Sequence, residues 1–119
     1  MTINQQLQGL YSLDHNIKLY IPSTKNANES TDNTAYINEA LELFGACFGG
    51  ATAYDALGSW VSNDKGLIVE PVKIIESYAS KEALTNGGLA KVLQYAKKIK
   101  TELKQEAVSL EYDNKLYFI

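Results

Sequence analysis

The chain has 119 residues, of which 45% are hydrophobic and 21% are charged, and its net charge at pH 7 is −3. These proportions are typical of one soluble globular domain, and they exclude a disordered tail, a collagen-like repeat and a disulfide scaffold. Eleven lysines without a single arginine on an acidic chain argue against nucleic-acid binding, because arginine supplies the planar fork that grips phosphate and guanine.

The predicted elements begin after a weakly patterned arm, residues 1–16. Apolar residues alternate through 17–21 and predict a strand, which Pro22 ends because proline cannot donate to a strand ladder. Residues 23–33 lack an apolar anchor and predict an exposed polar loop. A helix is expected over 34–48, where apolar residues recur at helical spacing.

Capping residues bound this helix. Asp32 or Asn33 can accept hydrogen bonds from its first N–H groups, and Gly49-Gly50 provides a left-handed stop. A strand is expected next over 51–62, with a kink at Gly58.

The polar residues Asn63–Gly66 predict a hairpin turn into a second strand over 67–79. Pro71 lies inside that strand and predicts a bulge or a break in its pairing. Ser80 can cap an early helical turn, and Asn86-Gly87-Gly88 should loosen the start of the helix that follows.

That second helix is marked by an apolar stripe from Leu89 to Leu103, with lysines on its other faces. Two short strands, 107–112 and 115–119, close the chain. Asp113-Asn114 joins them, and both residue types tolerate the positive φ angles of a tight hairpin turn.

This order predicts an α+β fold: a ferredoxin-like βαββαβ domain over residues 17–119, with an extra C-terminal hairpin strand. The antiparallel sheet should carry both helices on one face, and its other face should stay open or meet a partner. By alternation, we expect the helices to be faced by Ile17, Leu19, Ile21, Ile74, Val108 and Leu110.

The open face is then expected to carry Lys18, Tyr20, Tyr54, Trp60, Lys73, Ser77, Ser109, Glu111 and Tyr117. Four of these are aromatic residues with a polar group, the type enriched at interfaces. The candidate binding residues are Tyr20, Tyr54, Trp60, Glu70, Lys73 and Tyr117. A homodimer or partner interface, an aromatic-walled ligand site and a surface covered by the arm are three alternatives that the sequence leaves open.

Catalytic and metal-binding motifs are absent from the pattern, and we expect no cofactor and no metal. His15 and Cys47 are single, and no Gly-x-Ser-x-Gly elbow presents a serine. The glycines of 45–50 end a helix, whereas a phosphate site needs a helix start. Glu70 and Lys73 beside Trp60 could orient a polar ligand, with Glu70 as a general base if it is buried; a surface ion pair is the simpler interpretation.

Location follows from two observations. No apolar run approaches the roughly 18 residues of a membrane span, and the first ten residues have no secretory pattern, so we expect a cytoplasmic protein without membrane contact.

The charge is uneven along the chain, with a balance of −5 over residues 1–64 (2 Lys against 7 acidic residues) and +2 over 65–119 (9 Lys against 7 acidic residues). Solvated helix faces or complementary docking patches would both explain it.

Several short motifs carry a family resemblance: Leu19–Thr24, Asp32–Tyr36, Phe48-Gly-Gly-Ala-Thr52, Gly58-Ser-Trp60, Gly66–Glu70 and Gln105–Val108. With them the chain resembles a group of small uncharacterised proteins of low-GC Gram-positive bacteria and their phages and plasmids. It is distantly similar to a domain-of-unknown-function family that includes predicted bacterial lipoproteins. The resemblance implies one domain and a mobile-element setting, and it transfers no catalytic residue.

The function expected from these observations is that of a non-enzymatic interaction protein. It would be encoded by a phage or plasmid, bind a protein partner or small ligand through the aromatic sheet face, and in one version inhibit a host defence system. The alternative is a small dimeric α+β enzyme or ligand-binding protein with a pocket between sheet and helices, where Glu70 or Tyr54 supplies the polar group.

Overall fold

The computed structural model describes residues 1–26 and 29–119. Its central strand is β1 (His15–Pro22), in which buried and half-buried residues alternate. Ile17, Leu19 and Ile21 are fully buried, and the residues between them are only half-buried. β1 therefore presents one face to the core and the other to a more open surface.

Five strands form one antiparallel sheet in the order β4-β5-β1-β6-β7. The flanking strands are β4 (Thr52–Ser62), β5 (Gly66–Ala79), β6 (Ser109–Tyr112) and β7 (Lys115–Phe118). Without the edge strand β7, this order is that of the ferredoxin-like fold, so the expected α+β architecture is confirmed.

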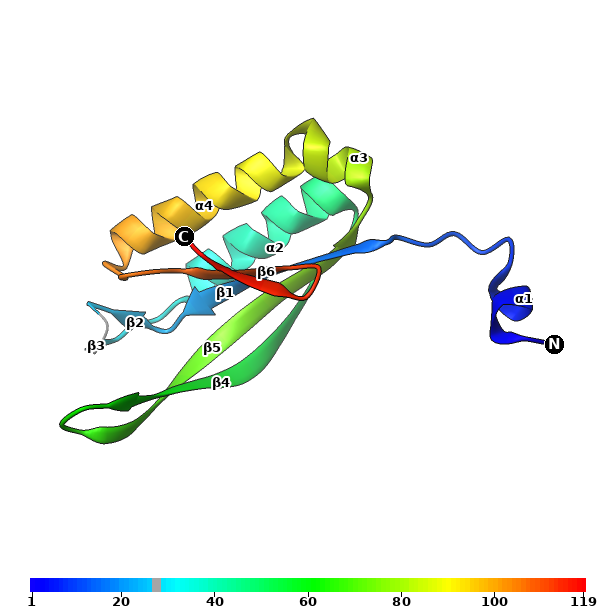
Figure 1. Ribbon diagram of the computed structural model, residues 1–119. Helices are drawn as coiled ribbons and strands as arrows, with labels where there is room; N and C mark the ends of the chain where they lie inside the picture. The colour runs from blue at the N-terminus through cyan, green and yellow to red at the C-terminus, as the bar shows by residue number, and fades with distance from the viewer. Residues whose placement is uncertain (27–28) are drawn as a thin grey trace.

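Both long helices, α2 (Thr34–Phe48) and α4 (Leu89–Glu102), lie on the same face of the sheet (Figure 1). The core between them and the sheet is apolar, and Phe44 is the largest of its fully buried side chains. Burying such side chains stabilises the fold by about 1.5–3 kcal/mol each. Its fully buried residues include Ile17, Leu19, Ile21, Ala40, Phe44, Ile75, Val92, Ala96 and Ile99.

The predicted helix boundaries are confirmed. Asp32 Oδ1 accepts a hydrogen bond from Thr34 N at 3.0 Å, and Gly49 ends α2 with φ +92°. Ser80 caps the short helix α3 (Lys81–Ala83) through a 3.0 Å bond from Ala83 N.

A kinked turn, η1 (Leu84–Gly88), joins α3 to α4, and Gly87 takes φ +103° there. A β carbon on Gly88 would lie 2.5 Å from the Ala83 carbonyl oxygen and 2.8 Å from a ring carbon of Phe48. The glycine pair thus allows α2 and the kinked turn to approach closely.

Two local expectations, the structureless loop over 23–33 and the bulge or break at Pro71, differ from the structure. The loop 23–33 contains a small hairpin of β2 (Thr24–Lys25) and β3 (Glu29–Ser30). Pairing between β4 and β5 continues past both Gly58 and Pro71 without interruption. Pro71 is tolerated because β1 ends opposite Val72, and beyond that point the Pro71 carbonyl accepts a bond from Ser23 Oγ instead of a strand neighbour.

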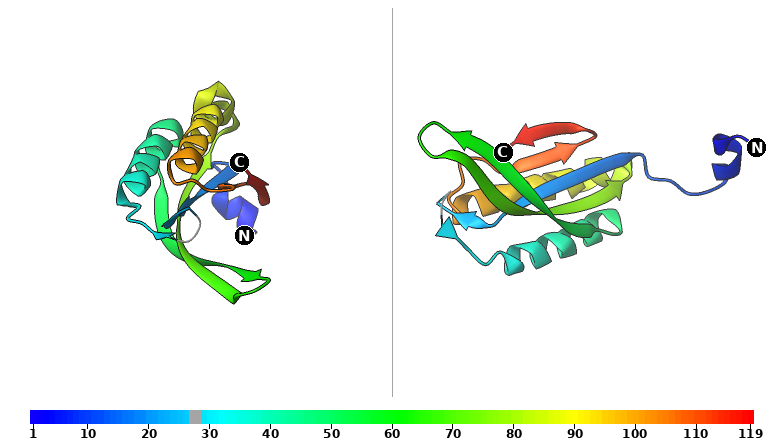
Figure 2. Two further views of the ribbon diagram at one scale, coloured as in Figure 1. Left: turned by 90° about the vertical axis from the view of Figure 1, so that its left-hand side faces the viewer. Right: turned by 90° about the horizontal axis from the view of Figure 1, so that it is seen from below.

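The arm is two residues shorter than predicted, because β1 already begins at His15. Residues 1–14 leave the body there and extend away from it (Figures 1 and 2). The arm contains one short helix, α1 (Ile3–Leu7), which buries no side chain. Among the described helices, none is both long and apolar enough to cross a membrane.

Candidate functional site

The sheet face away from the helices, here called the open face, is curved, with the β4–β5 hairpin bending outward on one side (Figure 2, left). Strand pairing decides which side chains it carries, because directly opposed residues point to the same side of a sheet. On β1, Lys18 opposes Glu76 of β5 and Glu111 of β6. Ile74 of β5 is opposed by Tyr20 of β1 on one side and by Tyr54 of β4 on the other.

A polar network lies across the middle strands of this face. The ammonium of Lys18 is 3.4 Å from Glu111 Oε2 and 3.8 Å from Glu76 Oε2. The Tyr20 hydroxyl donates to Glu111 Oε1 at 3.2 Å, and the Asn16 amide donates to Glu76 Oε2 at 2.9 Å. One lysine therefore separates two half-buried carboxylates that would otherwise repel each other.

The network shifts two titrations. Burial alone would lower the pKa of Lys18, but the Glu111 charge, with smaller contributions from Tyr54 and Glu76, raises it above its ordinary value. Burial, followed by the hydrogen bond to Glu111, raises the pKa of the Tyr20 phenol. Lys18 therefore stays charged and Tyr20 stays neutral near pH 7.

Beside this network the open face is hollowed, with a volume of about 640 Å³. Apolar side chains form the larger part of its walls, and the polar groups come from Tyr20, Ser23, Ser59, Trp60, Glu70, Gln105 and Ser109. A small-molecule site combines these two kinds of lining. The lining includes Tyr20, Trp60, Glu70, Val72, Ile74, Ser109, Leu116 and Phe118.

Glu70 lies at the edge of this hollow and also lines a second one of about 680 Å³ beside the β2–β3 hairpin. Its side chain is half-buried. Trp60 borders both hollows from the neighbouring strand. No salt bridge engages Glu70 within residues 1–26 and 29–119, so its carboxylate is available to a ligand.

Four predicted orientations are wrong. Lys73 opposes Ile21 and Ser77 opposes Ile17, so both point to the helix side, and Ile74 lies on the open face. Tyr117 opposes the buried Leu110 and also belongs to the helix side.

The contacts of the two misplaced polar residues agree with the pairing. Lys73 Nζ bonds Asp55 Oδ1 at 2.6 Å, so it forms no pair with Glu70, and Ser77 Oγ donates to the Gly50 carbonyl at 2.6 Å. Of the candidate binding residues, Tyr20, Tyr54, Trp60 and Glu70 thus share the open face, while Lys73 and Tyr117 do not.

Sequence reasoning missed Leu116 and Phe118, which line the hollow in place of Tyr117. A signal was present. The two-residue turn Asp113-Asn114 makes Tyr112 oppose Lys115, and counting outward from that pair puts Leu116 beside Glu111.

Other sequence candidates have structural roles. Asn86 and Gly87 form the kink before α4. Cys47 is half-buried beside Leu43 and Lys91 in a small hollow of about 270 Å³. No cluster of three metal-ligating side chains occurs in the described ranges.

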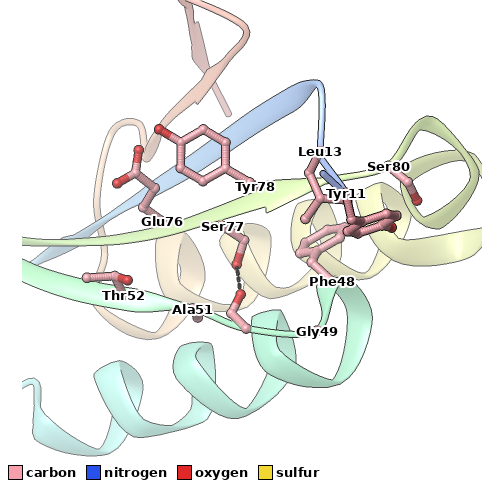
Figure 3. Close-up of a pocket in the computed structure, with 11 residues that line it drawn as sticks. Tyr11, Leu13, Phe48, Gly49, Ala51, Thr52, Glu76, Ser77, Tyr78 and Ser80 are labelled. Carbon is pink, nitrogen blue, oxygen red and sulfur yellow. Dashed lines mark hydrogen bonds between the residues drawn. The ribbon is translucent and has the colours of Figure 1, made fainter. Parts of the chain in front are cut away.

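A further hollow, of about 570 Å³, lies where the arm meets the body (Figure 3). Tyr11 and Leu13 of the arm lie at one end of it with Phe48 and Ser80, while Glu76 and Tyr78 point away toward the other end. The labelled rings do not converge on one point, so this hollow is not an aromatic cage (Figure 3).

Comparison with known proteins adds to this geometry. No protein-family model matches the chain, and no curated protein matches it by sequence. Two solved structures of a phage SAM lyase are similar to it. The apo structure aligns with a TM-score of 0.65 and 17% identity, over 94% of this chain and 93% of the lyase chain.

The structure of the lyase in complex with S-methyl-5′-thioadenosine aligns with a TM-score of 0.62 and 17% identity, over 92% of this chain and 94% of that one. The chain shares the fold of a phage SAM lyase. A Bacillus cereus protein related to NIF3 aligns less well, with a TM-score of 0.48 and 15% identity, over 95% of this chain and 28% of that chain.

Proposed function

We propose that the open-face hollow binds a sulfonium nucleoside of the S-adenosylmethionine class and that the chain cleaves it to S-methyl-5′-thioadenosine. The observation that carries this proposal is the Glu70 carboxylate, unpaired within the described residues, at the edge of an apolar hollow that Trp60 and Tyr20 also line. The likeness in fold to a lyase crystallised with that nucleoside supports the choice of ligand.

The residues suit the parts of such a ligand. Trp60 and Tyr20 offer flat rings on which an adenine can stack. Glu70 can accept hydrogen bonds from the substrate's ammonium group. Its charge would be unhelpful at the sulfur, because the positive charge there disappears as the carbon–sulfur bond breaks, and transition-state binding would weaken.

The cleavage needs no second reactant. The substrate's own carboxylate oxygen attacks the γ carbon, the bond from that carbon to sulfur breaks, and its electron pair stays on sulfur. The products are a neutral thioether and a lactone that keeps the ammonium charge, so atoms and charge balance. A negative and a positive charge cancel in this step, and an apolar hollow lined by Ile74, Leu116 and Phe118 favours such a loss of charge.

The test is to incubate the purified chain with S-adenosylmethionine and to measure S-methyl-5′-thioadenosine by liquid chromatography. We expect product with the natural chain and a loss of at least tenfold in rate for Glu70→Gln and for Trp60→Ala. Glu106→Gln, an exposed position outside the hollow, is the matched control. Absence of both product and binding by calorimetry would refute the proposal.

A second candidate function is a non-enzymatic one: capture of a protein partner, in one version a component of a host defence system, through the open face. The exposure of Trp60 (55%) and Phe118 (70%) favours it, because large exposed aromatics are typical of interaction surfaces. The alternative of a small dimeric enzyme or ligand-binding protein with a pocket between sheet and helices has less support, because core residues such as Phe44 and Ile75 pack between the two layers.

These two candidates separate experimentally. A partner-binding role predicts that Trp60→Ala and Tyr20→Ala abolish partner retention on an affinity column while circular dichroism shows an intact fold. If both variants retain the partner as well as the natural chain does, the open face is not the surface that binds it. Product formation from S-adenosylmethionine is measured separately and decides the first proposal.

A further inference from the structure

The side chain of Tyr20 lines the open-face hollow, and its hydroxyl is bound by the neighbouring strand β6. Tyr20 lies on β1 two residues beyond Lys18, and Lys18 opposes Glu111 of β6. Glu111 is therefore the diagonal neighbour of Tyr20 on the same face, at a separation that an aromatic side chain can span. The bond of 3.2 Å from the Tyr20 hydroxyl to Glu111 Oε1 fits this geometry.

Glu111 is itself held in place. Its second oxygen, Oε2, lies 3.4 Å from the Lys18 ammonium, and only 21% of its side chain is exposed. A carboxylate accepts a stronger hydrogen bond from a phenol than a neutral oxygen does. Lys18, Glu111 and Tyr20 thus form a line of three side chains, each bonded to the next, and the line ends at the hollow.

Glu76 provides a comparison within the same network. Its side chain is also 21% exposed, and its Oε2 lies 3.8 Å from the same Lys18 ammonium. That oxygen accepts a hydrogen bond from the Asn16 amide at 2.9 Å. Asn16 precedes Lys18 by two residues, whereas Tyr20 follows it by two. The two carboxylates therefore share one lysine, and Glu111 is the one that binds a side chain of the hollow.

The Tyr20–Glu111 bond restricts the Tyr20 ring before a ligand binds. A half-buried side chain without such a bond exchanges between staggered rotamers. A ring that is already fixed loses little freedom when a flat ligand stacks on it, so the ligand binds more tightly. Burial, followed by this same bond, raises the pKa of the Tyr20 phenol, and the hydroxyl therefore remains a donor at pH 7.

We propose that Glu111 is a positioning residue of the open-face hollow: it accepts the Tyr20 hydroxyl bond and so fixes the ring on which a purine base stacks, while Lys18 orients Glu111. The choice of a purine nucleoside as ligand rests on the proposed function. The affinity of the hollow for the base then depends on a carboxylate beside the hollow, and Glu76 leaves that affinity unchanged.

The test is the dissociation constant of S-methyl-5′-thioadenosine, measured by calorimetry. Glu111→Leu removes the acceptor, and Tyr20→Phe removes the donor but keeps the ring. Each change should weaken binding about fivefold, the loss expected when one side chain has to be ordered by the ligand. Glu111→Gln keeps an acceptor oxygen and should restore most of the affinity. Glu76→Leu is the matched control and should bind as the natural chain does.

The double variant separates positioning from a general loss of structure. Tyr20→Phe combined with Glu111→Leu should bind no more weakly than either single variant, because the second change removes no further interaction. Additive losses, or an equal loss for Glu76→Leu, overturn this inference alone. A natural chain that does not bind the nucleoside refutes the proposed function and this inference with it. Circular dichroism on every variant shows whether it is folded.

A readout without ligand tests the bond itself. The Tyr20 phenol is titrated by NMR in protein labelled on its tyrosine rings, with Tyr20→Phe assigning the signal. Glu111→Leu should lower the pKa of this phenol below that in the natural chain, because the hydrogen bond and the charge of Glu111 both raise it. Glu76→Leu should leave that titration close to the natural one. A titration that Glu111→Leu does not change overturns the inference.

Discussion

His15 Nδ1 lies 2.7 Å from Asp113 Oδ2, and this contact joins two residues 98 positions apart in the chain. Asp113 also accepts a hydrogen bond from Asn16 N at 2.9 Å through Oδ1. The turn between β6 and β7 is thereby tied to the point where the arm becomes β1. The Tyr112 ring stacks on His15 with 5.9 Å between the ring centres, which completes the junction.

This junction predicts a loss of stability in acid. The His15 hydrogen bond, then the Asn16 N–H, lowers the pKa of Asp113 below its ordinary value of 3.8. A carboxyl whose pKa is lower in the folded state than in the unfolded chain stabilises the fold at pH values above its unfolded-state pKa. That contribution is lost as the pH falls through the folded-state pKa. Asp113→Asn should therefore flatten the decrease of melting temperature below about pH 4. Glu106→Gln is the control, and identical acid limbs for Asp113→Asn and the natural chain contradict the prediction.

Tyr95 predicts a dependence on alkaline pH. Its hydroxyl donates to the Tyr36 carbonyl at 2.8 Å, and burial raises the pKa of the phenol far above its ordinary value of 10. The folded state therefore holds this proton more tightly than the unfolded chain does. The contribution of Tyr95 to the free energy of unfolding is fully present below pH 10 and declines as the pH rises above it. Tyr95→Phe should cost about 1 kcal/mol at pH 7 for the lost hydrogen bond and should reduce the decline above pH 10.

Urea unfolding at several pH values measures both effects of Tyr95→Phe. The decline should be reduced and not abolished, because the pKa values of Tyr20, Tyr36 and Tyr112 are also raised. An unchanged alkaline slope would show that the Tyr95 phenol does not govern it.

Gly88 and Gly45 form a matched pair of tests for close packing. Gly88→Ala places a β carbon against the Ala83 carbonyl and the Phe48 ring, and we expect a cost of about 1–3 kcal/mol. Gly45 lies within α2 and has open space around the β-carbon position, so Gly45→Ala should stabilise by about 0.5–1 kcal/mol. Chemical denaturation gives both values. Equal effects of the two changes would contradict the close approach of η1 to α2.

Lys18 predicts a salt-dependent electrostatic effect on the open face. Lys18→Met leaves the Glu76 and Glu111 carboxylates facing each other without the cation between them, and it should cost roughly 1 kcal/mol at pH 7. The cost should shrink at high ionic strength, because salt screens the repulsion between the two carboxylates. Lys104→Met on the exposed surface is the control. A cost that does not change with salt concentration would show that packing of the lysine stem dominates.

Much of the fold could be predicted because local signals agreed with one another. Asp32, Gly49 and Ser80 mark helix boundaries through hydrogen bonds and φ angles that depend only on nearby residues. The turn at Asp113-Asn114, with φ +46° and +68°, is equally local. The small β2–β3 hairpin has no such signal, since its polar residues lack any alternating pattern.

The candidate site could be predicted only in part. Lys18 and Tyr20 alternate with buried aliphatic residues, so their face is readable from the strand itself. Ile74 and Ile75 are adjacent and both buried, so alternation within β5 does not say which of them meets the helices. The consecutive apolar residues Leu116, Tyr117 and Phe118 leave the same ambiguity in β7.

By itself, the sequence determined the element order, the caps, the turns and the absence of arginine, because each depends on a residue and its close neighbours in the chain. Only the tertiary structure decided which residues share the open face. A shift of one residue in pairing reverses every side chain of a strand, and that pairing depends on strands far away in the sequence. Through this long-range register Glu70, Trp60 and Phe118 come to line one hollow, and Lys73 and Tyr117 do not.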